Sequence, residues 1–350
     1  MARSSNLSRT GVGAGAKRAP ALDSQTQAIV KRLDALAERA PDLAGPAAFY
    51  RAVLLALREA QAEAQAKIPP FTLDREAAQR KLESGLPLLV GEDFPLDVEA
   101  TRDLFLRLCR IAESASPDGE TGKPGRRFSH FLRGPLRADR SAQSVPAQAR
   151  DGDGTAQRSA AAAQIRGAVE RNELDLLPVW EALALGDGRR VERVAAGLRL
   201  DAGLLRLLAE NSLKPSLRAW SRELRGKVDV DHWLRGQCPM CGSPPLLSEI
   251  QGKEGERRLR CGMCGAGWYY LRLKCAFCGN QDHRTLGTIG VEGEEEKYRV
   301  QTCDKCRGYL KIVVTFDPTP VDLLAVEDLA TLHLDLIAAE RAYVRAPVRE

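Results

Sequence analysis

The stretch KCAFCGNQDHRTLG (residues 274–287) places Cys275 and Cys278 on one predicted turn with two residues between them and Gly279 directly after them. A C-x-x-C pair of this kind can form a redox disulfide, supply half of a metal site, or be two buried thiols. The chain contains three further pairs with the same spacing: Cys238/Cys241, Cys261/Cys264 and Cys303/Cys306. The role of the pair therefore depends on the partners that the other three supply.

The spacing of the four pairs, which we call knuckles 1 to 4 in chain order, predicts metal binding. Eight of the nine cysteines belong to these knuckles, and the gaps between consecutive knuckles are 19, 10 and 24 residues. A two-residue spacer lets both sulfurs reach one ion at about 2.3 Å. The first gap lies within the range typical of tetrathiolate sites, and the third slightly exceeds it. Eight sulfurs then make two four-sulfur sites, which we favour over disulfides in a reducing compartment.

Two pairings of the knuckles are open. In an interleaved cross-brace, knuckle 1 would join knuckle 3. We favour the sequential pairing, because a predicted strand pair then lies between the two knuckles of each site, as in a ribbon. The predicted ligands are Cys238, Cys241, Cys261 and Cys264 for site 1, and Cys275, Cys278, Cys303 and Cys306 for site 2.

The residues around the knuckles have predicted supporting roles. Glycine follows the first three knuckles and permits a positive φ there, whereas Arg307 holds this position in knuckle 4, so that this turn is expected to differ slightly. His232 and His283 are not needed as ligands. Nearby basic residues are expected to offset the negative charge of the thiolates; they are Arg257, Arg258, Arg260, Arg272, Lys274, Lys305, Arg307 and Lys311.

The sulfur ligands leave the metal open. A tetrahedral four-sulfur site suits zinc or a mononuclear rubredoxin-type iron, and the residues do not separate the two. Such a closed site offers no position for a substrate. No acid–base or nucleophile set stands out elsewhere, so we predict no catalytic residues and no enzymatic activity.

Composition bounds the class of protein. The 350 residues carry a net charge of +5, with 44% hydrophobic and 28% charged residues, as in a globular soluble protein. This charge permits an acidic partner without demanding nucleic acid. The sequence contains no run of about 18 apolar residues, so we predict no membrane insertion. The basic N-terminal stretch lacks the apolar core of a secretory leader. We therefore expect a cytoplasmic location.

Periodicity predicts an α+β protein, with an N-terminal all-α domain, two small rubredoxin-like or zinc-ribbon β modules, and a C-terminal helix. The predicted divisions are a disordered N-terminus (1–22), a helical domain (23–226) with a disordered loop (114–156), a first metal module (227–270), a second metal module (271–318), and a helix with tail (319–350). Helices are expected from Asp23 or Ser24, and over 47–66, 97–112, 160–185, 190–208, 211–225 and 321–343. Strands are expected over 246–251, 257–261, 267–275, 283–291, 297–303 and 309–316. Cys109, on the 97–112 segment, is expected to be a buried structural thiol.

Four segments together resemble the formate dehydrogenase accessory protein (FdhE) family: CPMCGSPPLLSEIQG, RCGMCGAGWYYLRLKCAFCGN, QTCDKCRGYLKIVV and VEDLATLHLDLIAAERAY. The resemblance covers residues 228–345. Its specific features are the four knuckles, the motif W-x-x-x-R-x-K-C between knuckles 2 and 3, and the acidic-to-leucine final helix.

The resemblance implies a non-enzymatic maturation factor, or chaperone, of the cytoplasm. Such a factor would bind the catalytic subunit of formate dehydrogenase and be needed for its assembly or activation. The resemblance also implies a rubredoxin-like C-terminal half with iron at the eight cysteines already named, so that iron is favoured and zinc is the alternative.

Two other functions compete with this one. A rubredoxin-like electron-transfer protein would use iron that is reduced reversibly. A zinc-ribbon protein that binds nucleic acid would show steeply salt-dependent binding. Whether the chain forms a homodimer is left open by the residues.

Overall fold

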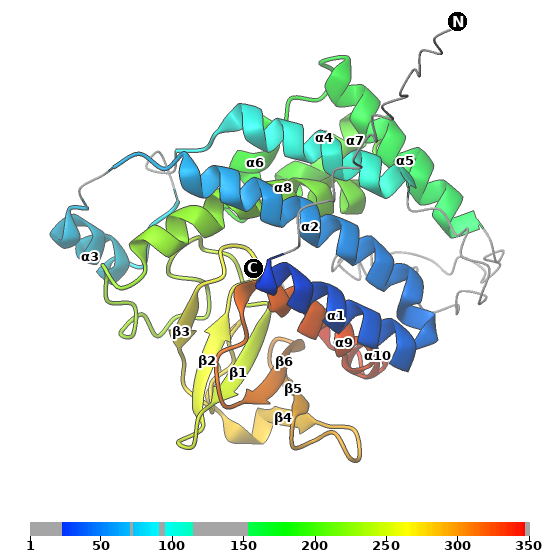
Figure 1. The fold of residues 1–350 in the computed structure, drawn as a ribbon. Helices are drawn as coiled ribbons and strands as arrows, with labels where there is room; N and C mark the ends of the chain where they lie inside the picture. Colours follow the sequence, from blue (N-terminus) through cyan, green and yellow to red (C-terminus); the bar gives the residue numbers. More distant parts are fainter. Residues whose placement is uncertain (1–22, 71–72, 91–94, 115–152, 347–350) are drawn as a thin grey trace, which may run out of the picture.

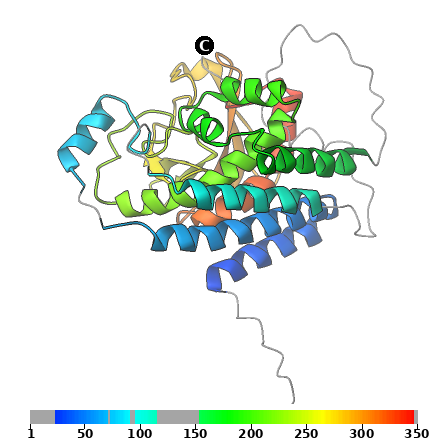
Figure 2. The same cartoon turned by 90° about the horizontal axis from the view of Figure 1, so that it is seen from above.

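The computed structural model describes residues 23–70, 73–90, 95–114 and 153–346. The predicted disordered N-terminus and residues 115–152 of the predicted loop lie outside this part of the chain, and residues 153–156 at the end of that loop are helical. Helices lie on one side of a mixed sheet (Figure 1), and α1, α2 and α4 run side by side when the molecule is seen from above (Figure 2). The predicted α+β fold class is confirmed.

The helical part is built around α8, which packs against α2 and α4 through buried residues such as Leu57, Phe105 and Leu205. Its helices are α1 (Ser24–Arg39), α2 (Ala44–Ala66), α3 (Arg75–Glu83), α4 (Val98–Ser114), α5 (Asp153–Glu170), α6 (Leu177–Ala184), α7 (Gly188–Gly197) and α8 (Ala202–Leu224), with a 3-10 turn η1 (Pro41–Leu43) before α2. In the described residues, no helix has the length and apolar character needed to span a bilayer.

Several predicted helix boundaries are wrong. The chain breaks before α8, where Arg199 has φ 55° and the Asp201 side chain caps the new helix by accepting from the amide of Leu204 at 2.8 Å. Helix α8 then continues through Pro215, where we expected a fresh start near 211. The predicted 160–185 helix is split by a turn at Asn172, which has φ 56°. Helix α3, capped by Asp74, was not predicted.

The sheet contains strands from both metal modules in the order β3-β2-β1-β6-β5-β4, with β7 pairing beside β6. Neighbouring strands are antiparallel except at the parallel pairs β1–β6 and β6–β7. The strands are β1 (Leu247–Gln251), β2 (Glu256–Arg260), β3 (Gly267–Tyr269), β4 (Leu286–Ile289), β5 (Tyr298–Cys303), β6 (Gly308–Thr315) and β7 (Val344–Arg345), with η2 (His283–Thr285) before β4. The predicted 267–275 strand is therefore too long.

The parallel pair joins the two halves of the sheet. Strands β1, β2 and β3 belong to the first predicted module, and β4, β5 and β6 belong to the second. In the join, Ser248 lies opposite Ile312 and Ile250 opposite Val314. The two ribbons thus form one continuous sheet, while the domain boundaries given above stay predictions.

A buried charge network fastens the C-terminal helices to the sheet. The ammonium of Lys311, on β6, contacts the carboxylates of Asp328 and Asp335 at 2.6 Å each. Arg345 also pairs with Asp328, and the Tyr309 hydroxyl donates to Asp335 at 2.8 Å. Asp328 lies in α9 (Leu324–Ala330) and Asp335 in α10 (Leu332–Glu340). Two cations face two carboxylates, so that the buried charges balance.

Ion pairs also connect the helical part to α9 and to the preceding 3-10 turn η3 (Val321–Leu323). Arg32 of α1 pairs with Glu327, and Arg58 of α2 pairs with Asp322. Arg218 of α8, which is buried, lies 3.3 Å from the same Asp322. The first helices of the chain are thus held against its last ones.

We predict that Asp328→Ala destabilises the protein by about 3–5 kcal/mol, because the buried Lys311 ammonium and Arg345 guanidinium lose the carboxylate that they share. Urea unfolding followed by circular dichroism measures the change. The matched control is Asp34→Ala, which breaks an exposed pair with Arg51 and should cost less than about 1 kcal/mol. Equal midpoints for the two variants would contradict this role of the network.

Asp328 also predicts the direction in which the stability of the folded protein changes with pH. Burial by itself would raise the pKa of Asp328, but the charges of Arg345 and Lys311 outweigh it and lower the pKa from 3.8 to about 2. A lowered pKa in the folded state contributes stability at neutral pH that is lost as the pH falls from about 4 to about 2. This part of the acid-induced loss should be missing in Asp328→Asn.

Candidate metal centres

Two groups of four cysteine sulfurs form at the turns that precede or connect the strands, and each could hold a metal ion. The first cluster is Cys238, Cys241, Cys261 and Cys264, and the second cluster is Cys275, Cys278, Cys303 and Cys306. Within each group all four sulfurs lie within 4.8 Å of one another. The knuckles therefore gather in sequential order, 1 with 2 and 3 with 4, and the interleaved alternative is not the arrangement of this structure.

The sulfur separations fit a tetrahedral ion. Four sulfurs at about 2.3 Å from a tetrahedral centre lie about 3.8 Å apart. In the second cluster the Sγ atoms of Cys275 and Cys306 are 3.7 Å apart, as are those of Cys278 and Cys303. In the first cluster the Cys238–Cys264 separation is 3.4 Å and the Cys241–Cys261 separation is 3.5 Å.

The knuckles share one backbone unit. The amide of the first cysteine donates to the carbonyl five residues later, as Cys275 does to Asn280 at 2.8 Å. The amide after the second cysteine donates back to the first, as Gly279 does to Cys275 at 3.0 Å. This turn needs a positive φ, and Gly242, Gly265 and Gly279 have φ of 75°, 76° and 74°. Glycine adopts that conformation without steric cost.

Knuckle 4 forms a similar turn without glycine, so the expected difference is not one of backbone conformation. Arg307 has φ 56°, which costs a residue with a side chain roughly 1–2 kcal/mol. Its guanidinium donates to the carbonyl of Arg341 at 2.6 Å, pairs with Asp304 at 3.2 Å and lies 4.0 Å from the ring centroid of Tyr343. The arginine thereby attaches this knuckle to the C-terminal segment.

The two clusters differ in burial. All four cysteines of the first cluster are buried, whereas Cys278 and Cys306 of the second are only half-buried. The helical part covers the first cluster: the amides of Leu88 and Leu89 donate to the carbonyls of knuckle 1 at 2.9 and 2.6 Å. Side chains of Val321 and Pro87 lie against the glycines that follow knuckles 2 and 1.

The thiols depend on one another for their charge. Burial raises the pKa of Cys238 and of Cys264, while hydrogen bonding from Cys238 lowers that of Cys241. In the second cluster, the hydrogen bond between Cys275 and Cys306 lowers the pKa of Cys275 to about 5 and raises the pKa of Cys306. Neighbouring thiols thus favour the thiolate of Cys241 in the first cluster and of Cys275 in the second, whereas burial disfavours the thiolates of Cys238 and Cys264.

Two of the basic residues that were expected to offset the charge of the thiolates form ion pairs with buried carboxylates instead. Arg260 pairs with the buried carboxylate of Glu249 at 2.5 Å, and Lys311 belongs to the network with Asp328. Arg257, by contrast, is buried near Cys275; burial lowers its pKa to about 10, and Tyr270 and Cys275 oppose that shift.

A cation near the first cluster comes from outside the knuckles. Burial lowers the pKa of Arg218, and the nearby charges of Asp322, Cys261 and Cys264 oppose that shift. Its guanidinium also donates to the carbonyl of Met263 at 3.4 Å. The sequence gives no local signal for this contact, because Arg218 lies on α8, far from knuckle 2 in the chain.

Other cysteine and histidine side chains lie apart from the clusters. Cys109 is buried within the helical part, and burial raises its pKa to about 12, as expected of a structural thiol. His232 is exposed and its Nδ1 contacts Asp229 at 2.9 Å. His283 is exposed in the turn η2. Among the described residues, neither histidine joins a group of side chains that could hold a metal ion.

Comparisons with known proteins agree with these features. Residues 237–272 match the family model described as the FdhE central domain, and residues 273–349 match that of the FdhE C-terminal domain. The chain is also similar to relatives called protein FdhE homolog, among them one from each of three organisms. The one from Aquifex aeolicus is 35% identical over 148 residues, covering 41% of this chain and 50% of the relative. The one from Pseudomonas aeruginosa is 40% identical over 137 residues, covering 36% and 44%.

The third, from Edwardsiella ictaluri, is 32% identical over 187 residues, covering 49% of this chain and 57% of the relative. The chain thus spans about half the length of the curated relatives it matches. The crystal structure of the FdhE protein from Pseudomonas aeruginosa aligns with a TM-score of 0.50 and 24% identity, over 92% of this chain and 94% of that one. That likeness is one of fold. The resemblance found in the knuckles is confirmed over residues 237–349.

We predict that a chelator removes metal from the second cluster at least roughly tenfold faster than from the first, because Cys278 and Cys306 are half-buried and the first cluster is enclosed. Metal release into a chromophoric chelator should therefore show two steps. Cys275→Ser should lose the fast step and halve the metal content, and Cys238→Ser should lose the slow one. Cys109→Ala is the matched control and should keep both. A single step from the unmodified protein would contradict the difference.

Proposed function

We propose that this protein is an accessory factor for formate dehydrogenase, starting from the match of residues 237–349 to the central and C-terminal FdhE domains. The observation that carries the proposal is the coincidence of that match with two complete four-sulfur clusters. The likeness in fold to the FdhE crystal structure extends over 92% of the chain and is consistent with this proposal.

The proposed partner is the catalytic subunit of formate dehydrogenase, bound in the cytoplasm during its assembly or activation. This follows from the family resemblance. Ion pairs hold α1, α2 and α8 against the turn η3 and helix α9. The helical part and the C-terminal helices cannot separate without breaking these pairs, so we expect them to bind a partner as one rigid unit. The proposal includes no catalytic step by this chain.

The eight clustered cysteines are the proposed ligands of two metal ions. The sulfur-only ligand set suits iron or zinc, and the resemblance favours iron. Bound iron of this type would add a one-electron couple, whereas zinc would only stabilise the sheet. Elemental analysis and the visible spectrum of freshly purified protein separate the two, since thiolate-bound ferric iron is coloured and zinc is not.

A second candidate function is electron transfer through the second cluster. The observation that favours it is the partial exposure of Cys278 and Cys306, which brings that cluster to the surface. It requires iron that is reduced and reoxidised reversibly while bound to this chain. Colourless protein containing only zinc would exclude this candidate and leave the accessory role standing.

We predict that deletion of the gene in its own host abolishes formate oxidation and that the unmodified chain restores it. Loss of either cluster should prevent rescue, because each cluster ties two knuckles of the sheet together. Formate-dependent dye reduction in cell extracts is the measurement, with the catalytic subunit quantified in parallel.

Cys109→Ala is the matched control and should restore activity, because Cys109 lies outside both clusters. Unchanged formate oxidation in the deletion strain would rule the proposal out. Co-purification of the chain with the catalytic subunit tests the binding step separately.

A further inference from the structure

Four exposed leucines lie on three segments that meet around knuckles 1 and 3. Leu273 is 67% exposed, Leu86 54%, Leu234 41% and Leu271 38%. Single exposed leucines are common on protein surfaces, but a group of them indicates an interaction site. Two of these four sit inside the W-x-x-x-R-x-K-C motif between Trp268 and Cys275, which the metal clusters alone do not explain.

Direct contacts connect the loops that carry these leucines. The ammonium of Lys274 donates to the carbonyl of Leu234 at 3.3 Å, which joins the loop before knuckle 1 to the loop before knuckle 3. The guanidinium of Arg235 lies against Gly85, the residue before Leu86. We call the group the Leu273 surface; its residues are Leu86, Leu234, Arg235, Leu271, Arg272, Leu273 and Lys274.

Buried donors hold the backbone of the first loop in place. The indole nitrogen of Trp268 donates to the carbonyl of Arg235 at 2.9 Å, and that of Trp233 donates to Gln237 at 2.6 Å. Leu234 between them has φ 44°, a conformation that costs a leucine roughly 1–2 kcal/mol. The loop is thus held in a strained form that presents a leucine to solvent.

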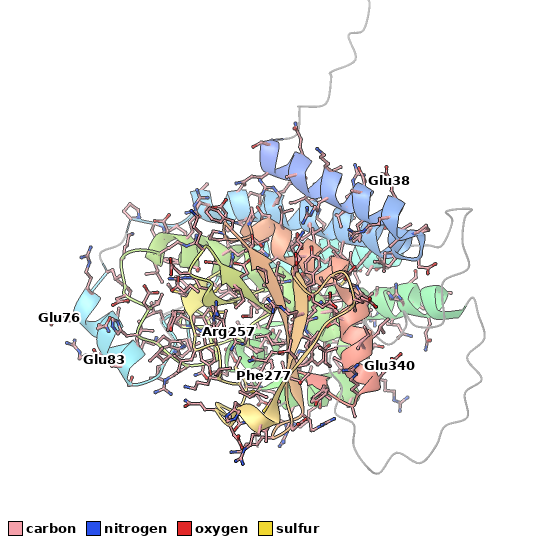
Figure 3. All side chains as sticks on the ribbon, turned by 90° about the horizontal axis from the view of Figure 1, so that it is seen from below. Glu38, Glu76, Glu83, Arg257, Phe277 and Glu340 are labelled. Atoms are coloured by element: carbon pink, nitrogen blue, oxygen red, sulfur yellow. The ribbon has the colours of Figure 1, made fainter. Side chains whose placement is uncertain are left out.

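A buried arginine holds the second loop. Arg257 donates to the carbonyls of Leu271 at 2.9 Å, Arg272 at 3.2 Å and Lys274 at 2.9 Å. It lies among the strands near Phe277 of knuckle 3 (Figure 3). These bonds divert the chain from strand β3 and fix the turn on which Leu271 and Leu273 are exposed. A surface ordered in advance loses little entropy on binding.

The cations of this surface lack acidic partners. Among the described residues, Arg235, Arg272 and Lys274 form no ion pair with a carboxylate; their polar contacts are with backbone carbonyls and aromatic rings. Arginines elsewhere are commonly paired, as Arg166 is with Glu113 and Glu170. Three unpaired cations beside four leucines complement a segment that is acidic and also carries apolar side chains.

We infer that the Leu273 surface is the docking site for an acidic segment with apolar side chains on the catalytic subunit of formate dehydrogenase. The inference rests on the proposed function and adds the place and chemistry of the contact. Exposed leucines supply the apolar contact area, and Arg235, Arg272 and Lys274 select for negative charge. The site lies beside knuckle 3, which supplies two sulfurs of the second cluster.

Binding of purified chain to immobilised catalytic subunit tests the inference. The two variants are Leu271→Ser/Leu273→Ser and Arg235→Glu/Arg272→Glu, all at exposed positions. Each should weaken binding at least roughly tenfold, since contacts at the centre of an interface commonly carry that much. Added salt should weaken binding of the unmodified chain and should no longer do so after charge reversal.

The matched control is Leu185→Ser/Arg189→Glu at the connection between α6 and α7. Leu185 follows α6 and is 65% exposed, and Arg189 is an exposed residue in the first turn of α7 that forms no ion pair with a described residue. This control should bind as the unmodified chain does. Metal content and circular dichroism confirm that each variant is folded.

The outcomes separate the two proposals. If the unmodified chain does not bind the subunit, the proposed partner and this surface both fall. If it binds and all variants bind equally well, the surface is wrong and the partner stands. If the leucine variant instead converts a dimer into monomers in sedimentation while binding the subunit normally, the occupant is a second copy and the inference is overturned.

Discussion

The parallel pairing of β1 with β6 places the rest of the C-terminal part. It sets two strands side by side on which Glu249 and Lys311 are both fully buried. A buried charge must have a partner, so Glu249 takes Arg260 and the amide of Thr319, and Lys311 takes Asp328 and Asp335. Because Thr319, Asp328 and Asp335 all follow β6, these contacts hold the chain after β6 against the sheet. The turn η3 and helix α9 then lie where α1, α2 and α8 can pair with them.

The knuckles and most strands could be predicted from local sequence, because each depends on a few neighbouring residues. The C-x-x-C spacing and the following glycine specify a turn, and alternation of side chains specifies strands such as β5 and β6. The join between β1 and β6 has no such signal, since four other strands, β2 to β5, lie between these two in the chain. The length predicted for β3 was wrong because Arg257 takes the carbonyls that a strand would have used.

The candidate metal sites likewise combine features that local sequence predicts with features that depend on residues distant in the chain. The spacing predicted two four-sulfur groups, and the predicted strand pairs favoured the sequential pairing that the structure has. The difference in burial between the clusters instead depends on Leu88, Leu89 and Val321, which come from distant parts of the chain. Arg218 could not be found for the same reason. In the helical part, α8 continues through Pro215 because packing on α2 and α4 outweighs the bond that proline removes.

The contacts between the first and last helices also bear on synthesis of the chain. Arg32 and Glu327 are 295 residues apart, and Arg58 and Asp322 are 264 apart. At about 5–20 residues per second, a ribosome needs roughly 15–60 s to travel from one partner to the other. Helices α1 and α2 can pack on each other during that interval, with Arg58 already paired to Asp23, but Arg32 and Arg58 lack Glu327 and Asp322 until η3 and α9 are made. Closure of the molecule therefore has to wait for η3 and α9, and until they are made α1 and α2 present to solvent the face that these elements later cover.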